Sequence, residues 1–136
     1  PLPAGLTGPN QDALAKGLAN LEQHIANVNA FGVPAVVAIN AFRDDPDDEL
    51  GCVQERAVAA GAVASVVSTH WADGGKGAEE LAQAVVAACA RPSAYAPLYP
   101  DSVPIKQKIE TIARRMYGAA GVVYVGQAES QIDMAS

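Results

Sequence analysis

The chain has 136 residues, a formal net charge of −6, and a composition that is 50% hydrophobic and 5% aromatic. This length supports one domain with a modest core, in which Ala and Val supply most of the apolar character. The acidic balance argues against a nucleic-acid partner, whose binding surface should be basic, and no apolar run reaches the ~20 residues that span a bilayer.

The beginning of the sequence lacks the charged-then-apolar order of a signal peptide, so we expect a cytoplasmic protein with no membrane partner. Cys52 and Cys89 are far apart and belong to no metal or redox spacing. We therefore expect two buried thiols in a reducing compartment rather than a structural disulfide.

The first predicted element is a helix that begins near Asn10, where Asn10 or Asp12 can cap it, and ends before Gly32 and Pro34. Its apolar residues recur at steps of four and three, which is typical of one buried helical stripe. This stripe consists of Leu14, Leu18, Leu21, Ile25 and Val28.

Two short apolar runs, 33–39 and 62–67, predict strands. Their hydrophobicity is continuous rather than alternating, which favours central parallel strands buried on both faces. Between them, a charged loop at 43–48 precedes a predicted helix that ends near Ala60, and the whole forms a right-handed βαβ unit. The inward residues expected on this helix are Leu50, Val53, Ala57 and Val58.

A third helix is predicted from Lys76 or Gly77 to Arg91, where Pro92 stops it. Its expected core face consists of Leu81, Ala82, Val85, Val86 and Cys89.

The remaining residues begin with a loop rich in Pro and Tyr at 93–104. They continue with a fourth helix at 105–117 that Gly118 caps, a short third strand at 122–125, and one or two helical turns at 127–134. The fold class is therefore α/β, with three layers and a small, mostly parallel sheet. Residues 1–92 form the helix and βαβ unit, and residues 93–136 are expected to pack as part of the same domain.

A ligand of an open α/β sheet binds outside the carboxyl ends of its strands. Asn40 and Phe42 follow the first predicted strand, and the stretch 68–77, which contains Trp71, follows the second. Both segments must leave the same edge of the sheet, so the two aromatic rings could clamp a flat ligand ring. Asn40 adds an amide that can pair with a purine edge. Three glycines allow the backbone to approach a ligand closely, namely Gly74, Gly75 and Gly77.

Each of these features also has a structural interpretation. A single Trp is often a core or interface residue, Asn40 can be a turn or cap residue, and glycines before a helix can form a simple turn. His70 is either a ligand or acid/base group, or a structural residue. His24 lies on a helix, where a surface position is the simpler interpretation.

Six stretches, in order and with similar spacing, resemble formate–tetrahydrofolate ligase, which occurs as a separate enzyme and as the synthetase part of C1-tetrahydrofolate synthase. The resemblance covers nearly the whole chain and is more specific than any single motif in it. The stretches are Asn20–Ile25, Phe31–Pro34, Val37–Phe42, Thr69–Ala78, Lys108–Ala113 and Tyr117–Ala119.

The resemblance implies a ligase with a P-loop NTPase-like fold that couples ATP, formate and tetrahydrofolate through formyl phosphate, with magnesium, as a cytoplasmic homo-oligomer. It implies that Phe42 and Trp71 hold the folate ring. It also implies that Asn40, Ser68 and the glycine pair Gly74-Gly75 line the nucleotide side. This chain would be one segment of that enzyme, and its partners would be the small-molecule substrates and the rest of the ligase chain.

The sequence departs from the family pattern in two respects. It has no G-x-x-x-x-G-K-[ST] phosphate loop, since no Ser or Thr follows Lys76. Asp44 and Pro46 stand where the family tends to have Thr. We therefore assign no catalytic residue and no metal ligand to this chain, and expect it to be inactive alone. The alternative is a non-catalytic folate- or nucleotide-binding or assembly module derived from the same fold.

Overall fold

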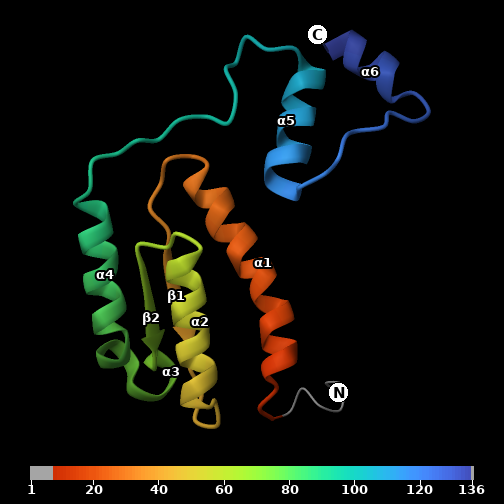
Figure 1. The fold of residues 1–136 in the computed structure, drawn as a ribbon. Coiled ribbons are helices and arrows are strands. Elements are labelled where there is room, and N and C mark those ends of the chain that lie inside the picture. Colours follow the sequence, from red (N-terminus) through yellow and green to blue (C-terminus); the bar gives the residue numbers. More distant parts are fainter. Residues whose placement is uncertain (1–7, 136) are drawn as a thin grey trace. The chain divides into compact units, whose positions relative to one another are not determined.

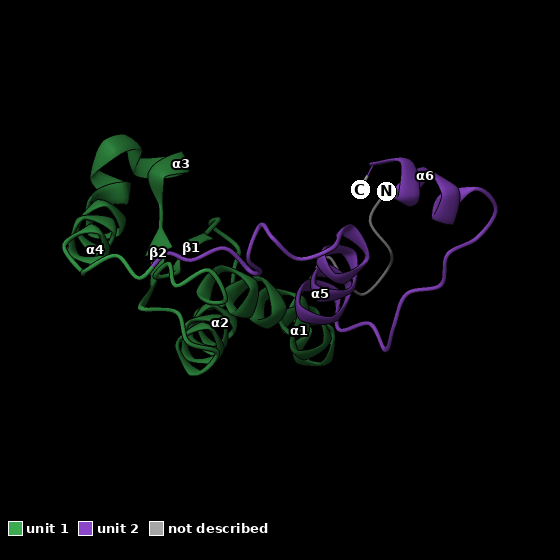
Figure 2. Ribbon diagram, turned by 90° about the horizontal axis from the view of Figure 1, so that it is seen from above, with its two compact units in different colours: residues 1–94 green, residues 95–136 purple. Residues whose placement is uncertain are grey.

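The computed structural model describes residues 8–135 (Figure 1). These residues form two compact units, and the boundary lies between Ala94 and Tyr95 (Figure 2). Within the described part of the chain, no helix combines the length and the apolar character that a membrane crossing requires.

Helix α1 spans Gln11–Asn29 and confirms the first predicted helix. Asn10 is the capping residue, because its side-chain oxygen accepts a hydrogen bond of 2.9 Å from the amide of Ala13. Leu18 and Ile25 of the predicted stripe are buried, whereas Val28 near the end of the helix is exposed.

The predicted βαβ unit is present. Strand β1 (Val36–Asn40) and strand β2 (Ala64–Ser68) form a two-stranded parallel sheet, and helix α2 (Asp47–Ala59) connects them. The register aligns Val36 with Ala64 and Asn40 with Ser68, so the strands run in step along their full length. Three acidic residues in the first turn of α2 complement the positive end of its helix dipole.

The first unit has three layers (Figures 1 and 2). Helix α2 covers one face of the sheet, with α1 packed against it, and helix α4 (Glu79–Cys89) covers the other face. Small and branched residues form the core beneath α1 and α2, which is consistent with the low aromatic content. The buried members of this cluster are Ile25, Ala35, Ala57 and Ala62.

The expected core face of the third helix is wrong. Ala88 is the buried residue of α4, whereas Ala82, Val85 and Cys89 are exposed and Val86 has 70% of its surface exposed. The two strands make a sheet only about 10 Å wide. One narrow stripe of residues on α4 is enough to cover it, so the other apolar residues of this helix stay exposed. The same reason explains why Val58 of α2 is exposed rather than inward.

The expectation of two buried thiols is also wrong. Cys52 is half-buried and Cys89 is exposed, and both are free cysteines.

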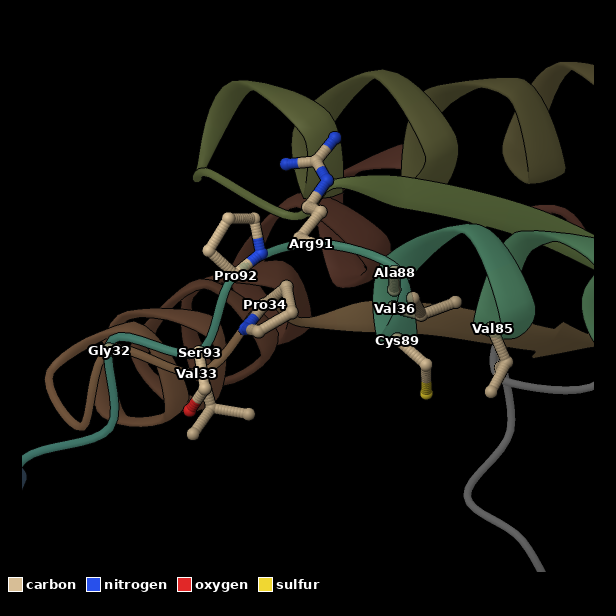
Figure 3. A pocket seen from close by; sticks show the side chains of 10 residues that line it. All are labelled: Gly32, Val33, Pro34, Val36, Val85, Ala88, Cys89, Arg91, Pro92 and Ser93. Carbon is tan, nitrogen blue, oxygen red and sulfur yellow. The ribbon is translucent and has the colours of Figure 1, made fainter.

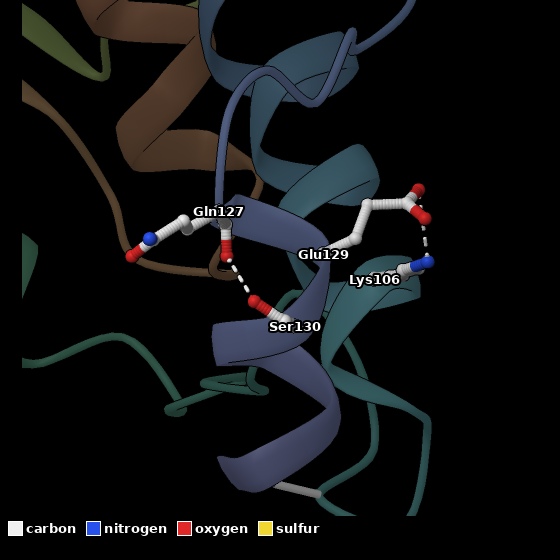
Figure 4. Close-up of polar contacts among 4 residues, drawn as sticks. All are labelled: Lys106, Gln127, Glu129 and Ser130. Atoms are coloured by element: carbon white, nitrogen blue, oxygen red, sulfur yellow. Dashed lines mark hydrogen bonds and ion pairs between the residues drawn. The ribbon is translucent and has the colours of Figure 1, made fainter.

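Helices α5 (Ile105–Tyr117) and α6 (Ala128–Ala135) form the second unit. Gly118 ends α5 in the left-handed conformation at φ 63°, as its position predicts. In Figure 4, Lys106 of α5 forms an ion pair of 3.2 Å with Glu129 of α6, and the Ser130 hydroxyl donates 2.9 Å to the carbonyl of Gln127.

The predicted third strand at 122–125 is absent. β1 and β2 are the only strands among residues 8–135, and Val123 and Val125 are strongly exposed. A strand requires a neighbour to accept its backbone hydrogen bonds. The β-branched composition of 122–125 predicts a local preference, but no described strand pairs with it.

Candidate functional site

The carboxyl ends of the two strands lie side by side, as parallel pairing predicts. Asn40 is in register with Ser68, and the amide of Ala41 donates a hydrogen bond of 3.0 Å to the carbonyl of Ser68. The segments that follow β1 and β2 therefore leave the same edge of the sheet. This edge places Phe42 next to Trp71.

Phe42 and Trp71 are in contact with each other. Their ring centroids are 5.8 Å apart with an interplanar angle of 61°, which is an edge-to-face pair. Both rings are largely accessible, at 56% and 70% exposure. A flat ring sandwiched between them would need about 7 Å between the two aromatic planes. The pair is thus closed, and one ring must turn aside before a ligand can stack between them.

A groove of about 770 Å³ surrounds this aromatic pair, a size typical of small-molecule sites. Its lining combines two aromatic faces, one cationic side chain and two carboxylates. The lining residues are Ala41, Phe42, Arg43, Asp44, Thr69, Trp71, Ala72 and Asp73.

Two short loops hold the aromatic rings in place. In the first loop, the Phe42 amide donates 2.8 Å to Asp45 Oδ2, and the Asp45 amide donates 3.1 Å to the Phe42 carbonyl. In the second, the Thr69 hydroxyl donates 2.7 Å to Asp73 Oδ2. The bond between Thr69 and Asp73 spans the one-turn helix α3 (His70–Asp73), which carries Trp71. Helix α3 was not predicted from the sequence. A Thr followed four residues later by an Asp can indicate such a turn, because polar side chains of this kind form local hydrogen bonds.

A short 3₁₀ helix, η1 (Gly74–Ala78), follows α3, so the predicted third helix begins later than expected. Gly74 has φ 58°, which favours glycine. Gly77 has a different role, because a Cβ there would lie 2.6 Å from the carbonyl carbon of Thr69. The Thr69 amide also donates 3.1 Å to the Gly77 carbonyl. Around Gly75, by contrast, a Cβ would meet nothing within 4 Å.

The residues predicted for the nucleotide side lie around the groove rather than in its lining. Ser68 is 2% exposed, and its hydroxyl lies 3.2 Å from His70 Nδ1 and donates 3.4 Å to the Gly77 carbonyl. Asn40 is exposed at the end of β1, and Gly74 and Gly75 belong to η1. Their nucleotide contacts remain a prediction. The role of Phe42 and Trp71 toward folate likewise remains a prediction.

A second, apolar cavity of about 400 Å³ lies beside the start of β1 and the end of α4 (Figure 3). Val33, Pro34 and Val36 contribute to it from the β1 side, and Val85, Ala88 and Cys89 contribute from α4. It shares no lining residue with the groove at the carboxyl ends of the strands.

Residues 8–135 contain no group of three or more His, Cys, Asp or Glu side chains arranged to hold a metal ion.

Comparison with known proteins identifies the family. Residues 3–136 match the family model described as formate–tetrahydrofolate ligase. A formate–tetrahydrofolate ligase of Desulforamulus reducens is 49% identical over 132 residues, which are 97% of this chain and 23% of that protein. The corresponding ligase of Yersinia enterocolitica is 44% identical over 133 residues, which cover 98% of this chain and 23% of the relative.

The cytoplasmic C-1-tetrahydrofolate synthase of Saccharomyces cerevisiae is 42% identical over 134 residues, 98% of this chain and 14% of that protein. The chain thus spans less than a quarter of the length of these curated relatives. It belongs to the formate–tetrahydrofolate ligase family.

Proposed function

We propose that this chain supplies part of the tetrahydrofolate- and nucleotide-binding crevice of a formate–tetrahydrofolate ligase. The observation that carries the proposal is the accessible Phe42–Trp71 pair at the carboxyl edge of the parallel sheet. This is the edge where open α/β sheets bind ligands. Family membership supports the ligase class, and the name of the family supports tetrahydrofolate as the substrate class.

In the proposed reaction of the whole enzyme, formate attacks the γ-phosphate of ATP, and formyl phosphate and ADP form. The folate amine then attacks the formyl carbon and releases phosphate, which gives 10-formyltetrahydrofolate. In this reaction, the chain holds the pterin ring between Phe42 and Trp71 and thereby orients the folate amine for its attack. Asn40, Ser68 and the Gly74-Gly75 turn form the nucleotide side of the same crevice.

The phosphoryl-transfer step is not assigned to residues of this chain. Such a step requires a cradle for the transferring phosphoryl group, and the 136 residues contain no phosphate-loop pattern. We therefore propose that the isolated chain does not formylate tetrahydrofolate. Product formed by the purified chain from ATP, formate and tetrahydrofolate would overturn this part of the proposal.

The whole enzyme is further proposed to have a P-loop NTPase-like fold and to be a cytoplasmic homo-oligomer that uses magnesium. The proposed location is supported by the yeast relative, which is named as a cytoplasmic C-1-tetrahydrofolate synthase.

The folate site is tested by titrating the chain with tetrahydrofolate while the emission of Trp71, its single tryptophan, is recorded. Quenching with a micromolar midpoint supports a retained half-site. No response, together with a stable dimer, favours the alternative of a non-catalytic assembly module. Circular dichroism checks that the chain is folded under the same conditions.

Calorimetry of Trp71→Ala separates the role of the ring from its use as a reporter. We expect a loss of about 1–3 kcal/mol in folate binding, the range of ring stacking on aromatic side chains. Tyr117→Ala is the matched control, because it removes a strongly exposed aromatic ring that does not line the groove. Unchanged affinity in Trp71→Ala would refute the aromatic clamp.

A further inference from the structure

Arg43 is the cationic side chain of the groove around Phe42 and Trp71. Of the eight described residues in its lining, Arg43 alone carries a positive charge, and Asp44 and Asp73 carry negative charge. The whole chain has a net charge of −6, which is unfavourable for a ligand that carries carboxylates. Any anionic part of a ligand in this groove has one favourable side chain to meet.

The guanidinium of Arg43 is not committed to the protein's own carboxylates. The ion pairs among residues 8–135 involve Arg56, Lys106 and Arg114, and none involves Arg43. Two neighbouring acids are engaged elsewhere, since Asp45 accepts the Phe42 amide and Asp73 accepts the Thr69 hydroxyl. Arg43 therefore lines the groove with its hydrogen-bond donors available.

Tetrahydrofolate has two chemically different ends. One end is a flat pterin ring that suits an aromatic pair, and the other is a glutamyl group with two carboxylates, joined to the ring by a p-aminobenzoyl spacer. Arg is the side chain best matched to a carboxylate, because its planar donors can bind both oxygens at once. Arg43 directly follows Phe42 in the sequence, so the donors for the tail and one aromatic wall lie in the same loop.

We propose that Arg43 is a specificity-determining residue that binds a carboxylate of the glutamyl tail of tetrahydrofolate. This assignment rests on the proposed function of the Phe42–Trp71 groove. Arg43 thereby distinguishes folates from pterins that lack the tail, whereas the aromatic pair binds the ring that both share.

The test compares two ligands by calorimetry: tetrahydrofolate, and a tetrahydropterin that carries a methyl group in place of the p-aminobenzoylglutamate. Arg43→Gln should weaken tetrahydrofolate binding about fivefold, as expected for a charge-assisted bond at a partly exposed site. It should leave tetrahydropterin binding unchanged. The fivefold difference should shrink as salt is added, and Arg43→Lys should retain part of the affinity.

Arg91→Gln is the matched control, because it removes the same charge from the separate apolar cavity and should change neither affinity. Equal tetrahydrofolate affinity in Arg43→Gln and the unmodified chain would overturn the assignment. Equal losses for both ligands would overturn it as well, since Arg43 would then act on the ring or the loop. Failure of the folded, unmodified chain to bind either ligand would instead overturn the proposed function of the groove.

Discussion

Gly77→Ala is the substitution that most directly tests how the turn after β2 is built. A Cβ at residue 77 would lie 2.6 Å from both the carbonyl carbon and Oγ1 of Thr69, and 2.7 Å from its carbonyl oxygen. Carbon atoms in favourable contact are about 3.5–4.0 Å apart, so the backbone must move by about 1 Å. Rotation of a side chain cannot relieve this clash, because two of the three atoms belong to the backbone.

Two losses follow from that movement. Overpacking of a tight contact costs about 1–3 kcal/mol. The hydrogen bond of 3.1 Å from the Thr69 amide to the Gly77 carbonyl would also weaken, which costs about 0.5–1.5 kcal/mol. Alanine also reduces the conformational entropy of the unfolded chain, which stabilises the folded state by about 0.4–1 kcal/mol and offsets part of these losses. We therefore expect Gly77→Ala to lower the free energy of unfolding by about 2 kcal/mol, within a range of about 0.5–4 kcal/mol.

Urea unfolding, followed by circular dichroism and by Trp71 emission, measures this loss. The dependence of the unfolding free energy on urea concentration should be the same for the variant and the unmodified chain. Gly75→Ala is the matched control, because it lies in the same 3₁₀ helix and its added Cβ would meet nothing within 4 Å. We expect it to be neutral or slightly stabilising. If Gly77→Ala were as stable as Gly75→Ala, the close approach of residues 69 and 77 would not constrain the turn.

Three further predictions concern stability and use the same unfolding assay. Gly32→Ala should destabilise more than Gly77→Ala, because Gly32 has φ 70° and its added Cβ would lie 2.0 Å from the carbonyl oxygen of Ala94; a smaller effect would contradict this contact. Ile25→Ala should cost about 2–5 kcal/mol because it leaves a cavity in the buried cluster, whereas Val86→Ala on the exposed side of α4 should cost well under 1 kcal/mol. Glu129→Gln removes an exposed ion pair and should change stability by less than about 1 kcal/mol; a larger loss would show that this pair is not merely a surface contact.

The sequence by itself determined the elements that depend on local interactions. The cap at Asn10 and the left-handed end at Gly118 are set by nearby backbone groups, so α1 and α5 begin or end where their patterns predict. Continuous apolar runs were sufficient to predict β1 and β2 as a parallel pair. Parallel pairing of these strands also predicts that Phe42 and Trp71 lie at one edge of the sheet, where the structure has them in contact.

Tertiary structure decided every property that depends on a neighbour from elsewhere in the chain. The run at 122–125 has strand composition but no pairing partner among the described residues, and Val86 is apolar but faces no part of the narrow sheet. The Phe42 and Trp71 rings contact each other edge to face, with centroids 5.8 Å apart. The spacing of the two residues in the sequence does not predict this orientation. Arg43 lines a groove only because the loop after β1 lies beside the loop after β2. Each loop supplies one side of that groove, so its existence depends on the fold and not on either segment alone.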